Sequence, residues 1–225
     1  MLKKIVSKTI SLIKKRSFEF DERITNQAIF HIAMYKFFDL VRGLFWLKKI
    51  SFVGAQTKLL SSSMVTCGTG VSIGRYCDID ALGKRGLVLG NSVSIGSYSM
   101  LKVSGTYSDI GSGIIVGDNV GIGDFAHIGG AGGVEIGNDT IIGAYFSVHP
   151  ENHNFSQHDT LIREQGVTRK GISIGSNCWI GAKVTVLDGS QIGNGCVVAA
   201  GAVVSGIFPN DVVIGGVPAK VLKER

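Results

Sequence analysis

The sequence predicts an all-β solenoid, a stack of short-stranded coils, preceded by a helical segment. Aliphatic residues recur every six positions, at Ile136, Ile142 and Val148 and again at Ile174, Ile180, Val186, Ile192, Val198 and Val204. Glycine directly follows several of them, as in Ile174-Gly175 and Ile180-Gly181. A period of six fits neither the 3.6-residue period of an α-helix nor the plain alternation of a strand. Short strands joined by tight corners, in coils that cover one another, explain both observations.

A third observation is that small or β-branched residues stand four positions after the repeat aliphatics, as a narrow coil interior requires. These positions are Thr140, Cys178, Val184, Cys196 and Ala202. Cys77 stands in the same place after Ile73. We therefore expect Cys77, Cys178 and Cys196 to fill the core as free thiols in a reducing compartment. Because no CxxC or Cys/His zinc spacing occurs, we expect no metal site.

The repeat is interrupted by a polar excursion. After Val148 the next position in phase would be residue 154, but the phase resumes only at Ile174, so twenty residues have been inserted. Loops that break a rigid repeat are where function tends to lie. The excursion carries three histidines, His149, His153 and His158.

Charge is concentrated in the first fifty residues, which hold eleven Lys or Arg against four acids, whereas the rest of the chain holds twelve against thirteen. Residues 1 to about 17 are basic and amphipathic, and a second helix is expected to follow, with Asp21 as its N-cap. This second helix is too polar to span a bilayer. Basic amphipathic helices lie on membrane surfaces, but helices also cover the ends of repeat cores. The sequence leaves both interpretations open.

We therefore divide the chain into a basic amphipathic helical segment (1–50), a repeat domain (51–209) with an inserted loop (149–171), and a C-terminal tail (210–225). The helices and the tail are candidates to cover the two ends of the solenoid. The early apolar stretch is too short for a signal peptide and is followed by basic residues, so we expect a cytoplasmic location.

Four stretches resemble the hexapeptide-repeat acyltransferases, and most closely the sugar O-acetyltransferases of bacterial surface-polysaccharide synthesis. They are the hexad array, the loop VHPENHNFSQHD, the segment NCWIGAKVTVLDG and the ending AAGAVVSGIFPNDVVIGGVPAKVLKER. The resemblance covers about residues 65 to 225. It implies a left-handed parallel β-helix and a homotrimer with sites between subunits. It also implies transfer of an acetyl group from acetyl-CoA to a sugar hydroxyl of O-antigen, capsule or exopolysaccharide.

Acyl transfer to an alcohol needs a base near neutral pH, and histidine, with an ordinary pKa of about 6.5, suits that role. In the family that this chain resembles, one histidine of this loop is the base. Its spacing from Ile142 and the NHNF context select His153, with His149 as the second choice. The resemblance implies direct attack of the hydroxyl on the thioester, with the backbone N–H of Ala182 stabilising the oxyanion.

The resemblance also implies where CoA binds: its pantetheine arm would lie against small corner residues, and lysines would meet its phosphates. The matching positions are Trp179, Gly181, Ala182, Ala200, Gly201, Lys220 and Lys223. Two positions depart from the family, since Gly206 replaces a frequent Lys and Gly123 replaces an acceptor-contacting Asn. The candidates to contact the acceptor are Asp124, His149 and Asn152.

Three other functions stay open. The nearest is N-acyl transfer to an amino sugar, and the next is a γ-type carbonic anhydrase, whose zinc ligands would be three histidines. His127, His149 and His153 are available, but their spacing does not match that family. The last is a non-catalytic solenoid. For the leading function the expected partners are acetyl-CoA and a sugar or lipid-linked saccharide. Residues 1–50 would associate with the inner face of the cell membrane or pack on the trimer, and no nucleic acid is expected.

Overall fold

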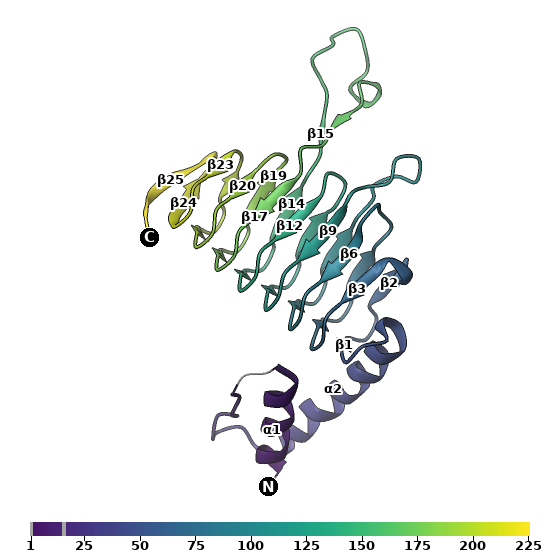
Figure 1. Cartoon of the computed structure of the whole chain (residues 1–225), viewed down its shortest axis with the longest axis vertical. Coiled ribbons are helices and arrows are strands. Elements are labelled where there is room, and N and C mark those ends of the chain that lie inside the picture. The colour runs from purple at the N-terminus through teal and green to yellow at the C-terminus, as the bar shows by residue number, and fades with distance from the viewer. Residues whose placement is uncertain (1, 15–16) are drawn as a thin grey trace.

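The chain folds into two helices followed by a stack of coils, each built from three short strands (Figure 1). The computed structural model describes residues 2–14 and 17–225. Successive coils contribute parallel strands to three sheets, named here A, B and C. The structure confirms the predicted left-handed parallel β-helix with N-terminal helices.

The strands are two to six residues long and follow one another around the coils. Sheet A contains β1 (Phe52–Val53), β4 (Ser72–Ile73), β7 (Ser94–Ile95), β10 (Gly121–Ile122), β13 (Ile141–Ile142), β18 (Trp179–Ile180), β21 (Val197–Val198), β24 (Val212–Gly216) and β25 (Ala219–Glu224). Sheet B contains β2 (Lys58–Leu60), β5 (Asp78–Asp80), β8 (Met100–Lys102), β11 (His127–Gly129), β14 (Ser147–His149), β19 (Thr185–Leu187) and β22 (Val203–Val204). Sheet C contains β3 (Val65–Cys67), β6 (Gly86–Leu89), β9 (Gly113–Val116), β12 (Val134–Ile136), β17 (Ile172–Ile174), β20 (Gln191–Ile192) and β23 (Ile207–Phe208).

The six-residue period is the packing period of the core. Each repeat aliphatic stacks on its equivalent in the next coil, as Ile136 does on Ile174 in sheet C and Val148 on Val186 in sheet B. All nine predicted aliphatic positions are at most 5% exposed. The three cysteines predicted to fill the core are also buried, and burial raises the pKa of the Cys77 and Cys178 thiols.

The glycines that follow the aliphatic residues are required by the close approach of neighbouring coils. A Cβ atom on Gly143 would lie 2.6 Å from the backbone nitrogen of Ala182, and one on Gly181 would lie 2.5 Å from that of Ala200. Both separations are below van der Waals contact, so any larger residue would push the coils apart.

The two helices are α1 (Leu2–Lys14) and α2 (Asn26–Leu47). The predicted N-cap at Asp21 is wrong: Thr25 caps α2 by accepting a hydrogen bond from the N–H of Ala28 at 3.2 Å. Asp21 instead accepts hydrogen bonds from Arg23, which lower the pKa of Asp21 to about 2. Neither described helix is long and apolar enough to cross a membrane.

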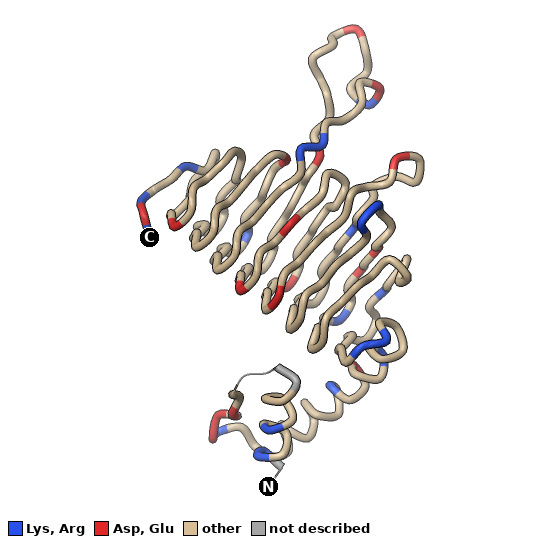
Figure 2. The backbone as a smooth tube through the Cα atoms, viewed as in Figure 1, with Lys and Arg blue, Asp and Glu red and all other residues tan. Residues whose placement is uncertain are grey.

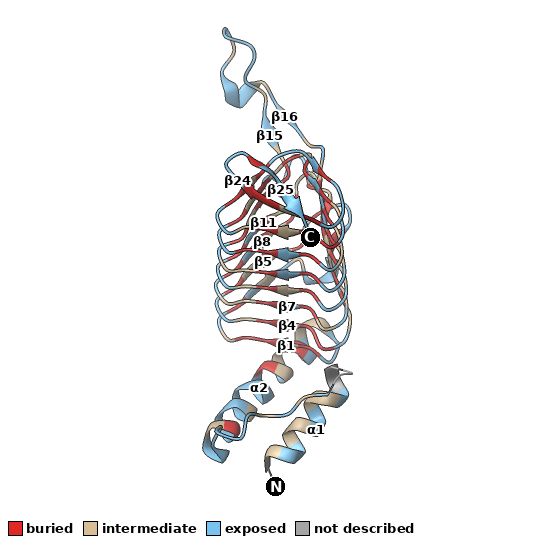
Figure 3. Ribbon diagram, turned by 90° about the vertical axis from the view of Figure 1, so that its left-hand side faces the viewer, coloured by how far each residue is buried: buried red, intermediate tan, exposed pale blue. Residues whose placement is uncertain are grey.

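Helix α2 covers the first coil through its C-terminal half. Arg42 donates from Nε to the carbonyl of Val53 at 2.7 Å, and Gly43 lies directly against the backbone of Ser51. Lys and Arg positions recur along both helices (Figure 2). Much of α2 is nevertheless exposed (Figure 3), including the aromatic side chains of Phe30, Phe37 and Phe45.

The other end of the stack is covered by the chain itself. Strand β24 continues sheet A beyond residue 209, and β25 turns back to pair antiparallel with it. The inserted residues leave the stack between sheets B and C as a hairpin, in which β15 (Asn152–His153) pairs antiparallel with β16 (Val167–Thr168). This hairpin, defined here as residues 150–171, projects well clear of the coils (Figure 1).

Candidate functional site

One corner of the solenoid satisfies its backbone N–H groups in a regular way. Between sheets C and A, an Asn or Asp side chain of one coil accepts a hydrogen bond from the corner N–H of the coil before it. Five such bonds of 2.6–3.0 Å join Thr69 to Asn91, Asn91 to Asp118, Asp118 to Asn138, Ser176 to Asn194, and Asn194 to Asn210. This corner therefore offers few free donors.

The corner between sheets A and B begins in the same way and then changes. Ser97 Oγ accepts from the N–H of Arg75 at 3.1 Å, and Asp124 Oδ1 accepts from the N–H of Ser97 at 2.7 Å. The equivalent positions of the next three coils hold alanine: Ala144, Ala182 and Ala200. A methyl group accepts no hydrogen bond, and none of these three N–H groups has an acceptor within the described residues. We call this column the alanine corner.

The alanine corner is bordered by an exposed aromatic side chain on sheet A. The indole of Trp179 is 56% exposed and pairs in register with Ile141, which is 57% exposed. A hollow of about 310 Å³ on one side of Trp179 includes Asp139 and Arg225 in its lining. A second hollow of about 360 Å³ is floored by glycines of the earlier coils. A Cβ atom on Gly201, at the open end of the corner, would have no neighbouring atom within 4 Å.

The predicted phosphate-binding lysines lie on the same sheet as Trp179. Lys220 and Lys223 are exposed on β25, opposite Gly215 and Val213 of β24. Strand β24 in turn pairs with β21, the neighbour of β18. The structure thus gathers the seven residues predicted to bind CoA at the C-terminal end of the solenoid, along sheet A and the alanine corner.

Two cations near this place were not predicted from the sequence. Lys183 follows Ala182 on the corner, and its Nζ lies 6.0 Å from the ring centre of Tyr145. Arg225 lines the hollow beside Trp179 and donates to the carbonyl of Gly195 at 2.8 Å. Lys183 lies in the segment NCWIGAKVTVLDG, which carries part of the family resemblance, but it was not among the predicted site residues. Nothing in the sequence signals that Arg225 folds back toward Trp179.

An aromatic ladder, consisting of Tyr76, Tyr98, Phe125 and Tyr145, runs along the same corner toward Lys183. Neighbouring rings are parallel within 7°, with centres 4.9–5.1 Å apart. All four residues have left-handed φ values of 56–61°. The shared backbone conformation aims the rings in one direction, so that each stacks on the next.

The predicted base lies elsewhere. His153 and Asn152 are exposed on β15 of the hairpin, and both line a hollow of about 480 Å³ together with Asn154, Phe155, Ser156 and Thr168. Because the hairpin leaves from the corner between sheets B and C, one chain does not bring His153 onto the alanine corner.

A second group of histidines lies on sheet B beside the alanine corner. His149 Nε2 lies 2.7 Å from Ser147 Oγ, and the ring centres of His149 and His127 are 5.7 Å apart. Loss of solvent around His127, and then the proximity of His149, lower the pKa of His127. Asp124, a candidate acceptor contact, lies on the corner three positions before His127.

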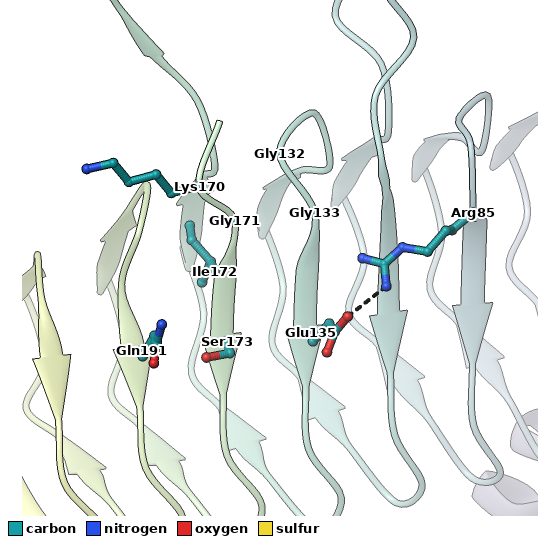
Figure 4. Close-up of a pocket in the computed structure, with 9 residues that line it drawn as sticks. All are labelled: Arg85, Gly132, Gly133, Glu135, Lys170, Gly171, Ile172, Ser173 and Gln191. Atoms are coloured by element: carbon teal, nitrogen blue, oxygen red, sulfur yellow. Dashed lines mark hydrogen bonds and ion pairs between the residues drawn. The ribbon is translucent and has the colours of Figure 1, made fainter. Parts of the chain in front are cut away.

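A further hollow of about 220 Å³ lies on sheet C, away from these residues (Figure 4). Arg85 crosses it and donates from Nη1 to Glu135 Oε1 at 2.7 Å. Within residues 2–14 and 17–225, no three His, Cys, Asp or Glu side chains are grouped closely enough to hold a metal ion.

The sequence matches a family model and several curated proteins. Residues 171–206 match the model of the bacterial transferase hexapeptide (six repeats). The putative lipopolysaccharide biosynthesis O-acetyl transferase WbbJ of Escherichia coli is 37% identical over 49% of this chain and 60% of its own length. The probable acetyltransferase Rv3034c of Mycobacterium tuberculosis is 30% identical over 80% of this chain and 56% of its own length. The chain thus spans only 56–60% of these two relatives.

Solved structures share the fold. A variant of AntD, an N-acyltransferase from Bacillus cereus in complex with dTDP-4-amino-4,6-dideoxyglucose and coenzyme A, has a TM-score of 0.54 and 18% identity. The alignment covers 79% of this chain and 81% of that one. The repeat pattern and the coil architecture show that the chain has the fold of the hexapeptide-repeat proteins, and the curated proteins that it resembles are named acetyltransferases.

Proposed function

We propose that this protein is an acetyl-CoA-dependent O-acetyltransferase that acts on a sugar hydroxyl in the synthesis of a bacterial surface polysaccharide. The observation that carries the proposal is the alanine corner. There the side chains that satisfy corner N–H groups in earlier coils are replaced by alanine, which leaves a row of backbone donors without an acceptor among the described residues, beside Trp179. The names of the relatives, both acetyltransferases, support the same reaction class.

The row of free donors suits the pantetheine arm of CoA, which carries amide carbonyls along an extended chain. Ala182 and Ala200 would donate to these carbonyls, because adjacent coils repeat the N–H group along the solenoid axis. Gly181 lets the coils that carry Ala182 and Ala200 approach each other closely, and Gly201, with open space around its Cα, leaves room for the pantetheine arm. Lys220 and Lys223 would attract the phosphates as point charges, and Trp179 would cover the arm.

The acetyl thioester supplies an activated carbonyl to the reaction. We propose that His153 takes the proton from the acceptor hydroxyl as its oxygen attacks that carbonyl, and that the Ala182 N–H donates to the carbonyl oxygen as negative charge builds on it. The attacking oxygen keeps the acetyl group, and CoA leaves as the thiol once it is protonated. No acyl-enzyme is required, in keeping with the burial of all four cysteines.

His153 is on a hairpin that leaves the solenoid between sheets B and C, whereas the alanine corner lies between sheets A and B. The reaction therefore needs a second copy of the chain, whose hairpin reaches the alanine corner of the first copy. A homotrimer with three equivalent sites satisfies this requirement by closed symmetry. His149 is the alternative base within a single chain, since it lies on the sheet that begins at the alanine corner. Asp124 and Asn152 are the proposed acceptor contacts.

We further propose that the protein works in the cytoplasm, with its helices at the inner face of the membrane. One side of α1 exposes Lys4 and Lys8 together with Ile5 and Leu12, and α2 exposes aromatic side chains. Basic and apolar groups on one helix face bind anionic membrane surfaces. Lys4→Glu with Lys8→Glu should abolish sedimentation with phosphatidylserine vesicles, while Lys58→Glu should not. Unchanged sedimentation would favour packing within the trimer.

The function is tested by incubating the purified protein with acetyl-CoA and a panel of sugars, lipid-linked saccharides and amino sugars, and measuring release of the CoA thiol. We expect release only with a hydroxyl acceptor, and O-acetyl product by mass spectrometry. Release that requires an amino sugar would instead establish N-acyl transfer. Failure to bind acetyl-CoA, with stoichiometric zinc in the same sample, would overturn the proposal in favour of a metal enzyme.

A further inference from the structure

The His153 hairpin is held together internally by its own polar groups. The N–H of Asn154 donates to the carbonyl of Gly166 at 3.1 Å. The side-chain amide of Gln165 donates to the carbonyls of Gln157 and Thr160 at 2.8 and 2.7 Å, and accepts from the N–H of Gln157 at 3.0 Å. Because the outer part of the hairpin is cross-linked in this way, the direction in which it points is set at its foot.

At the foot, Arg169 joins three separate segments. Its Nε donates to Glu151 Oε2 at 2.6 Å, across the two stems and next to the pair formed by Asn152 and Thr168. Its Nη1 donates to Asp109 Oδ2 at 2.7 Å. Asp109 belongs to an earlier excursion, between β8 and β9, which leaves the solenoid at the same corner.

The Arg169 side chain is only 22% exposed, less than that of either carboxylate partner. Burial opposes its charge, but hydrogen bonds and the charges of Glu151 and Asp109 outweigh this and raise the pKa of Arg169. A planar guanidinium with several fixed donors can hold two carboxylates at defined angles, which a lysine ammonium cannot.

The following coil holds the second stem from the other side. Asp188 is buried and accepts hydrogen bonds from the N–H groups of Lys170 and Gly171 at 2.9–3.1 Å. The first stem is pressed against the preceding coil, where Gly132 lies directly against the carbonyl of Pro150. Asp188 and Gly132 restrain the stems near the solenoid, whereas Arg169 restrains them further out.

We propose that Arg169 is a positioning residue that fixes the direction in which the hairpin presents His153, with Asp109 as an outer brace. The inference rests on the proposed function of His153 as the base. A misplacement of about 1 Å can cost a reaction about 100-fold in rate. Arg169→Ala should therefore lower kcat by about 10- to 100-fold, while acetyl-CoA affinity stays within about twofold of the wild type.

Arg169→Lys should recover part of the lost rate, because a lysine can meet one carboxylate at a time. Arg85→Ala is the matched control, since it removes an arginine whose ion pair is with Glu135 on sheet C and which makes no hydrogen bond or ion pair with the described residues of the hairpin. The control should keep the wild-type kcat. The proposal is overturned if Arg169→Ala keeps the wild-type kcat. It is also overturned if the acetyl-CoA affinity of this variant falls by as large a factor as its kcat.

Amide hydrogen exchange provides a readout that does not depend on activity. Residues 151–154 and 166–170 should exchange faster in Arg169→Ala than in wild type and in Arg85→Ala, while the coils should be unchanged. Equal exchange rates of these two segments in Arg169→Ala and Arg85→Ala would contradict the proposed positioning role of Arg169. If the wild-type protein transfers no acetyl group, the proposed function fails by itself, and the exchange result alone decides the role of Arg169.

Discussion

The N–H of Ser97 donates to Asp124 Oδ1 at 2.7 Å, and this bond is the last of its kind along the corner between sheets A and B within the described residues. In the next three coils the methyl group of an alanine stands in place of the acceptor. The corner N–H groups of these coils therefore lack a protein acceptor among the described residues, and such groups are free to bind carbonyl groups of a ligand. The proposed donor site begins where the side-chain caps end.

Restoring a cap should weaken acetyl-CoA binding. A serine at position 200 would lie over the N–H of Ala182 as Ser97 lies over that of Arg75, where the bond is 3.1 Å. We expect Ala200→Ser to reduce affinity by about 5- to 30-fold, since one hydrogen bond to the ligand is lost and its donor is occupied. Ala144→Ser would cap the N–H of Asp124 instead and is the control in the same calorimetric titration. Equal affinities in the two variants would contradict the proposed placement.

The choice of base can be decided by two substitutions. His153→Ala should lower the rate of transfer by about 10²- to 10⁴-fold if His153 is the general base, with acetyl-CoA affinity unchanged. His149→Ala should retain most of the rate. Loss of activity in His149→Ala with activity kept in His153→Ala would place the base beside Ser147 and remove the need for a second copy of the hairpin.

The aromatic ladder should contribute to stability. Tyr98 stacks on Tyr76 on one side and Phe125 on the other, and each aromatic pair contributes about 0.5–1.5 kcal/mol. Tyr98→Ala should therefore lower the free energy of unfolding by about 1–3 kcal/mol. Tyr107→Ala removes a ring that is 84% exposed and should change stability little. Denaturant titration compares the two, and similar losses would mean that stacking is unimportant.

Stability should fall in mildly acidic solution because of His127. Its pKa is lowered in the folded state, so the unfolded chain binds more protons at pH values between the folded pKa and about 6.5. The free energy of unfolding therefore decreases as the pH drops through this window. His127→Gln should reduce the decrease between pH 7.5 and 5.5, whereas His158→Gln, on the exposed hairpin, should not. An identical decrease in both variants would rule out His127 as the cause.

The repeat made most of the fold predictable. A period of six fixes which residues face the coil interior, so the buried columns through Ile174, Ile180 and Val186 followed from spacing alone. The N-cap of α2 was missed because Asp21 and Thr25 both suit that role, and only the structure shows that Asp21 is engaged by Arg23.

The site was less predictable because its features depend on which coils are neighbours. Insertions change the spacing between equivalent ladder rings, so Tyr98 and Phe125 are 27 positions apart but adjacent in space. Likewise, Arg169 and Asp109 are 60 positions apart and lie in excursions outside the repeat. The missing caps of the alanine corner become visible only when each corner N–H is matched with the side chain of the next coil.

The most direct test of the account is a crystal structure of the protein with CoA. It should show the pantetheine arm along the alanine corner, with its carbonyl oxygens within 3.2 Å or so of the backbone nitrogens of Ala182 and Ala200, and the hairpin of a second copy bringing His153 toward the thiol. CoA bound elsewhere, with these N–H groups bonded only to water, would contradict the proposed site.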